Sequence, residues 1–96
     1  MSDIRVISSH DHELKPLVAT ALENELRIIH AGIKRTRQRL RYFEEKYGLS
    51  SNEFLRRYEN DELNETPDFA EWVGEIRMLG RLNEKSEILK DIRIAN

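Results

Sequence analysis

Residues 22–47 read LENELRIIHAGIKRTRQRLRYFEEKY, and this stretch decides the fold. From Leu26 onward its apolar positions recur at alternating steps of three and four, with Thr36 filling the one gap. That 3.5-residue repeat is typical of a helix that packs one stripe of side chains against a partner helix. Gly48 follows directly, where glycine ends a helix in a left-handed conformation. We therefore predict one long helix from about residue 14 to residue 47.

The early half of this helix is apolar on a second side as well, through Leu14, Leu17, Ala21 and Ile28. A helix of roughly 30 residues is about 45 Å long, which a chain of 96 residues cannot enclose. We therefore expect the helix to lie in a hairpin or a bundle, with its early half in contact with two neighbours.

The later half of the helix carries a dense basic run with no acidic residue within it. Its members are Lys34, Arg35, Arg37, Arg39 and Arg41. Three interpretations stay open: an exposed face balanced by acids elsewhere in the fold, a surface for an acidic protein partner, or a nucleic-acid surface. Asp68, Glu71 and Glu75 are the acids expected near it.

Two further helices are indicated by their first residues. Ser50 followed by Glu53 forms a capping box, and Leu49 and Phe54 a hydrophobic staple, which predicts a short helix over about 51–60. Thr66-Pro67-Asp68 is a typical helix start and predicts a second long helix over about 67–93.

Folding the chain at the short helix brings Gly80 level with residues 32–36. Because glycine inside a helix costs about 1 kcal/mol relative to alanine, we expect the long helices to cross closely at Gly80. Trp72 comes near Phe43 and Tyr47 in the same arrangement, as a core residue or as an anchor for a partner. The helix-packing or dimer candidates are Leu22, Leu26, Ile29, Ile33, Leu40, Phe43 and Gly80.

Residues 1–13 form an N-terminal arm with three open alternatives: a loosely ordered arm, a short strand, or an extension of the first helix. Ile4, Val6 and Ile7 are β-branched and favour the strand, which would need a second copy or another protein to complete its hydrogen bonds. Residues 10–13 read HDHE, but this spacing lacks the pattern of metal-binding helices. We expect no metal and no cofactor.

The composition excludes several classes of function. The net charge of −2 argues against broad nucleic-acid binding, and no apolar run approaches a membrane span. The sequence contains no phosphate-binding glycine loop, no Ser/His/Asp ordering and no cysteine. We expect a cytoplasmic, non-enzymatic protein of one domain.

Residues 43–59 (FEEKYGLSSNEFLRRYE), the acidic turn 61–63 (DEL) and residues 68–72 (DFAEW) together resemble small helical antitoxin-like proteins of prokaryotes. Those proteins are encoded beside a small toxin. The resemblance covers about half of the chain and leaves out the N-terminal half. It implies a non-enzymatic partner of a toxin, held in a complex that blocks it.

The predicted fold is all-α: a long antiparallel helical hairpin with a short connecting helix, pairing with a second copy into a dimeric, coiled-coil-like four-helix bundle. The predicted function is to bind and neutralise a small cognate toxin. The alternatives are a self-assembling scaffold and a nucleic-acid-binding regulator. Candidate partner-binding residues are Lys34, Arg35, Arg37, Arg41, Tyr58 and Trp72.

Overall fold

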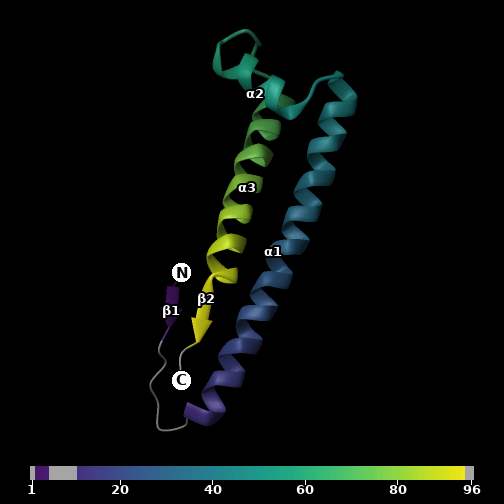
Figure 1. Cartoon of the computed structure of the whole chain (residues 1–96). Coiled ribbons are helices and arrows are strands. Elements are labelled where there is room, and N and C mark those ends of the chain that lie inside the picture. The colour runs from purple at the N-terminus through teal and green to yellow at the C-terminus, as the bar shows by residue number, and fades with distance from the viewer. Residues whose placement is uncertain (1, 5–10, 95–96) are drawn as a thin grey trace.

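The computed structural model describes residues 2–4 and 11–94. Its elements follow in the order β1 (Ser2–Ile4), α1 (Asp11–Tyr47), α2 (Ser51–Glu59), α3 (Pro67–Lys90) and β2 (Ile92–Ile94). Helices α1 and α3 lie side by side along most of their length, and α2 lies across one end of the pair (Figure 1). The molecule measures 59 × 22 × 17 Å. The predicted helical hairpin with a short connecting helix is confirmed.

The local signals that divide the helices act as expected. Gly48 takes a φ of +63° directly after α1, which a residue with a Cβ adopts only with strain. The Ser50 hydroxyl accepts a hydrogen bond from the Glu53 backbone N–H at 3.1 Å. The Thr66 hydroxyl accepts one from the Phe69 N–H at 3.1 Å. Each hydroxyl thereby satisfies a backbone donor that has no partner within its helix.

The second half of the predicted capping box is replaced by other contacts. The Glu53 carboxylate accepts hydrogen bonds from Arg56 and Arg57 instead of reaching back to the cap residue. The Ser51 N–H donates to the carboxylate of Glu44 at 2.8 Å. A side chain of α1 therefore caps α2, which fixes the angle between the two helices.

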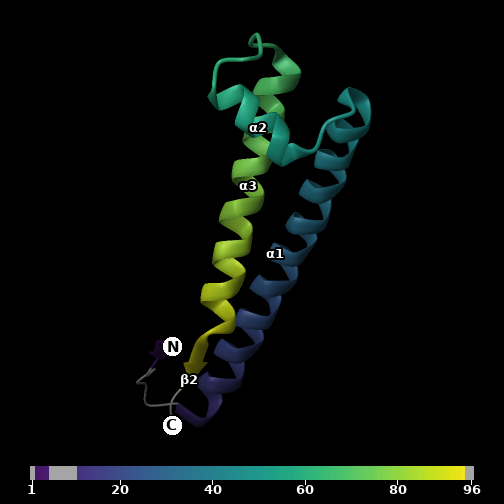
Figure 2. The same ribbon diagram turned by 45° about the horizontal axis from the view of Figure 1, so that its top comes forward.

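Helix α2 closes one end of the hairpin, here called the closed end (Figure 2). The hydrophobic core lies at this end. Its buried members are Leu40, Phe43, Phe54, Trp72 and Val73. The rings of Phe54 and Trp72 stack with centroids 3.9 Å apart. The ring of Phe43 also stacks on Trp72, with centroids 5.5 Å apart and an angle of 15° between the ring planes. Offset-stacked aromatic rings stabilise a core beyond the area they bury.

The other end of the hairpin, the open end, comprises residues 14–33 of α1 and 80–90 of α3. Here Gly32 lies against Leu82, and a Cβ built on Gly32 would stand 3.2 Å from the Leu82 Cδ1. The close crossing lies at the predicted level, but the assignment of Gly80 to it is wrong, because Gly80 is exposed and a Cβ there meets nothing within 4 Å. The close approach of the two helices is at Gly32 instead.

The remaining packing candidates face the seam between the helices. Ile29, Leu40 and Phe43 are buried. Leu22, Leu26 and Ile33 are half-buried.

The N-terminal strand finds its partner within the chain. β1 pairs in parallel with β2, with Ser2 opposite Ile92 and Ile4 opposite Ile94. The expectation that a strand here needs a partner from another molecule is therefore wrong. The cause is that α3 ends at Lys90, earlier than predicted, which leaves residues 92–94 free to pair. The remaining residues of the expected strand region, 5–7, lie outside the described part of the chain.

Candidate partner-binding surfaces

Helix α1 carries three exposed cations on one side. Lys34, Arg37 and Arg41 are separated by three and four residues, so they lie on one face of the helix, here called the basic face. The side chains of these three residues make no hydrogen bond or ion pair with any other residue in the described part of the chain. Their charges are therefore available to another molecule.

The expected balance by acids of α3 holds on the other side of α1 only. Arg39 is hydrogen-bonded to Glu71, and Lys46 donates to Asp68 at 2.7 Å. The hydrogen bond from Arg39 lowers the pKa of the Glu71 carboxyl. Hydrogen bonds from Lys46 and then from the Tyr47 hydroxyl lower the pKa of Asp68. This side of the hairpin is a set of internal ion pairs.

Arg35 lies between these two situations. It is exposed and has no ion pair within the described residues, yet it lines a hollow together with Arg39, Glu71 and Glu75. The acids of that hollow place it on the balanced side of α1. The basic face is thus narrower than the sequence run that predicted it.

A second hollow of about 270 Å³ opens beside the basic face. Arg37 and Arg41 line it from α1, and Ser50, Ser51 and Asn52 line it from the start of α2. Glu44 is the acid in this hollow, and its carboxylate already accepts the Ser51 N–H. Polar residues at the start of α2 therefore border the two arginines.

The other two candidates for partner binding lie elsewhere. Trp72 is 0% exposed, and its indole N–H donates to the Ser51 hydroxyl at 2.9 Å. We therefore assign it to the core rather than to a partner surface. Tyr58 is half-buried on α2, and its hydroxyl donates to Glu65. Neither side chain adjoins the basic face as a free group.

Three of the four residues on the second apolar side of α1 are exposed in the single chain, whereas Leu14 is half-buried. Leu17 is 67% exposed, Ile28 is 65% exposed, and Ala21 between them is also exposed. Of the two neighbours expected for this half of α1, the described part of the chain supplies one, α3. Sequence periodicity found this surface, although it did not enter the candidate binding residues.

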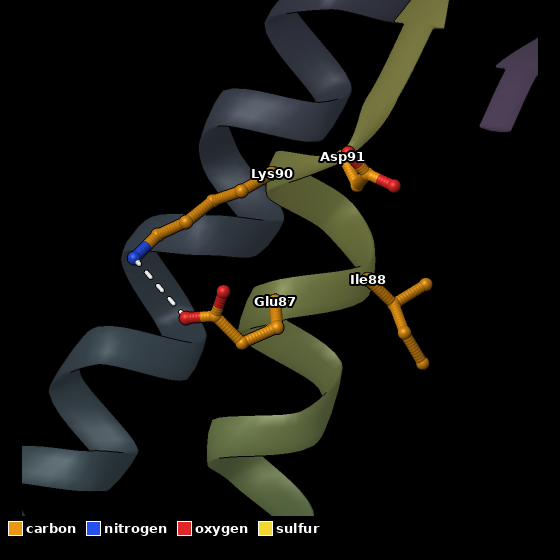
Figure 3. Close-up of a pocket in the computed structure, with 4 residues that line it drawn as sticks. All are labelled: Glu87, Ile88, Lys90 and Asp91. Atoms are coloured by element: carbon orange, nitrogen blue, oxygen red, sulfur yellow. Dashed lines mark ion pairs between the residues drawn. The ribbon is translucent and has the colours of Figure 1, made fainter. Parts of the chain in front are cut away.

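Helix α3 also exposes an apolar residue at the open end. Ile88 is 55% exposed, and its side chain projects from α3 on the opposite side from the ion pair between Lys90 and Glu87 (Figure 3). It also lines a hollow of about 250 Å³ with Glu25 and Ile29 of α1 and with Leu89. The groove between the helices is therefore open and apolar at this end.

The described residues offer no group of three or more His, Cys, Asp or Glu that could hold a metal ion. Of the HDHE segment, His12 and Glu13 are exposed, whereas His10 lies outside the described residues. Within the same part of the chain, no helix is both long and apolar enough to cross a membrane.

Comparisons with known proteins find no relative. No family model matches the chain, and neither a curated protein nor a solved structure is significantly similar to it. The resemblance to antitoxin-like proteins therefore stays a prediction that depends on residues 43–72 alone.

Proposed function

We propose that this chain is an antitoxin-like protein-binding module, which holds a small cognate toxin through the basic face of α1. The observation that carries the proposal is that Lys34, Arg37 and Arg41 are exposed and unpaired within the described residues, although acids pair with Arg39 and Lys46 nearby. Cations fixed on a packed helix form a preorganised surface, which binds at a lower entropic cost than a flexible one.

The charge pattern favours an acidic protein surface over nucleic acid. The basic face spans about 10 Å along the helix axis, from Lys34 to Arg41. The whole chain carries a net charge of −2, which opposes approach to a polyanion. Exposed ion pairs contribute about 0.2–1 kcal/mol each, so three of them mainly orient the partner and speed its association.

A self-assembling scaffold is the second candidate, and the exposed side of α1 favours it. Burying Leu17 and Ile28 would each contribute on the order of 1–2 kcal/mol, and two copies double that gain. The total is comparable with the lower estimates of the cost of association. We therefore propose that two hairpins pair into a four-helix bundle, in addition to holding the toxin.

Growth rescue in bacteria tests the proposed function. Expression of a small open reading frame that neighbours this chain's own gene should arrest growth, and co-expression of this chain should restore it. The test variant replaces the basic face with glutamine (K34Q, R37Q, R41Q) and should lose rescue. The matched control removes the same charge from exposed positions of α3 that lie outside both proposed surfaces (R77Q, R81Q, K90Q) and should keep it.

Binding affinities measured with the purified proteins test the same surface directly. The basic-face variant should bind the toxin roughly 3- to 150-fold more weakly, because three exposed ion pairs together contribute about 0.6–3 kcal/mol. Its affinity should also depend less on salt. Equal affinities for the wild type and the basic-face variant would refute the assigned surface. A neighbouring protein that neither arrests growth nor binds this chain would refute the antitoxin-like function itself.

A further inference from the structure

The exposed stripe of α1 has the same spacing from both ends. Its members are Leu17, Ala21, Asn24 and Ile28, which follow one another at steps of four, three and four residues. Residues at this spacing lie on one face of a helix. All four are exposed, with a large apolar side chain at each end and smaller side chains in the middle.

The open end lacks a core of its own. Of the described residues in that half of the hairpin, Ile29 is the buried apolar one, whereas the closed end buries five. The half that is short of buried apolar surface is also the half that exposes Leu17, Ile28 and Ile88. The most exposed of the large apolar side chains therefore lie at the open end.

We propose that a second copy of this chain covers the stripe, with the two α1 helices antiparallel across a two-fold axis that passes midway between Ala21 and Asn24. In a two-fold interface, if residue i of the first copy contacts residue j of the second, then residue j of the first copy contacts residue i of the second. Leu17 of each copy then packs on Ile28 of the other, and Ala21 faces Asn24. The small central residues let the helices approach closely. This inference specifies the self-association proposed above and does not depend on the toxin.

Charge at the rim favours a second copy over an unrelated protein. Glu25 of α1 and Lys85 of α3 line the same apolar hollow beside the stripe. Neither makes an ion pair with another described residue. Each copy brings one acid, Glu25, and one base, Lys85, to the rim, so the charges of these residues in the two copies sum to zero. The second copy is also always present in equal amount.

Sedimentation of the purified chain tests the contact without the toxin. The wild type should sediment with twice the 11.4 kDa mass of the chain. Ile28→Glu should raise the dimer dissociation constant by roughly 100-fold or more, because two carboxylates would lose water without gaining partners. The control Ala19→Glu adds the same charge to the same half of α1 on the opposite face, and should remain a dimer. Circular dichroism would show that both variants stay helical.

Cysteine cross-linking tests the orientation, and the chain has no cysteine of its own to confuse it. In the antiparallel dimer, the two copies of position 17 lie about 16 Å apart along the axis, too far for a disulfide. Leu17→Cys and Ile28→Cys should therefore form a disulfide when mixed, and neither should do so alone. A monomeric wild type, an unchanged affinity of Ile28→Glu, or cross-links between identical positions would each overturn the proposal. All three readouts are independent of growth rescue.

Discussion

Replacing Trp72 by alanine should remove a large part of the stability of the fold. The indole ring is 0% exposed. It stacks on Phe54 with ring centroids 3.9 Å apart and on Phe43 with ring centroids 5.5 Å apart. Its N–H donates to the Ser51 hydroxyl at 2.9 Å. One side chain therefore connects α1, α2 and α3 at the closed end.

The expected magnitude follows from these contacts. Truncation of a buried tryptophan costs about 3–5 kcal/mol through lost burial and the cavity that remains. A chain of 96 residues has a total stability of about 5–14 kcal/mol. We expect Trp72→Ala to lose about 4 kcal/mol. Trp72→Phe keeps one stacked ring and should lose about 1–3 kcal/mol, since it also gives up the hydrogen bond to Ser51.

Urea unfolding followed by circular dichroism measures the effect, because the alanine variant has no tryptophan fluorescence. Tyr42→Ala is the control, since Tyr42 is 45% exposed and its loss should cost at most about 1 kcal/mol. A loss below about 1 kcal/mol for Trp72→Ala would refute the assignment of this residue to the core. It would return Trp72 to the set of residues able to anchor a partner.

Two further predictions concern backbone and charge. Gly80→Ala should raise stability by about 1 kcal/mol, because the added Cβ meets no atom within 4 Å and alanine favours the helix. Gly48→Ala should lower stability, because Gly48 has a positive φ. Thermal unfolding compares the two variants, and a destabilised Gly80→Ala would contradict the exposed position of Gly80. Hydrogen bonds from Arg56 and then Arg57 lower the pKa of Glu53 to about 2 from 4.5. The stability that Glu53 contributes is therefore present above pH 4.5 and lost as the pH falls towards 2. At low salt, Glu53→Gln should make the melting temperature depend less on pH between 4.5 and 2. Parallel plots of melting temperature against pH for the wild type and the variant would contradict this.

The axial alignment of the hairpin followed from the sequence, but the rotation of its second long helix did not. Gly32 lies against Leu82, two residues beyond Gly80, so Gly80 is level with Lys34 as predicted. The error lies in its direction, because Gly80 follows Leu79 by one position and is turned about 100° away from the seam. The position of a glycine in the sequence indicates where a helix is weak, but it does not indicate which side of the helix faces a neighbour.

The pairing of the two short strands lay beyond the sequence for a different reason. Ile92-Arg93-Ile94 alternates as a strand does, but Leu89 and Ile92 are also three residues apart, as on a helix face. Three residues cannot separate the two periods. Their pairing with β1 depends on contacts between the first and last residues of the chain, which no local pattern encodes.

Among the candidate binding residues, the sequence located the basic run but not its division into two sides. A run of cations at mixed spacing surrounds a helix, and only the position of α3 decides which of them meet acids. Arg39 faces Glu71, whereas Lys34, Arg37 and Arg41 face away from α3's acids. Trp72 could not be assigned from its type alone, because tryptophan is favoured both in cores and in binding sites.

The two proposed surfaces of α1 are compatible with each other. The residues of the basic face are turned roughly 120–180° around the helix from Ile28, so a second copy on the stripe leaves Lys34, Arg37 and Arg41 uncovered. A dimer would then present two basic faces on its outer sides and hold two toxin molecules. If the toxin is itself a dimer, the second basic face binds the second toxin subunit within the same complex. The overall affinity then rises although each contact is unchanged. On this view the stripe adds avidity to the basic face, and a monomeric variant keeps the specificity of the interaction but loses its strength.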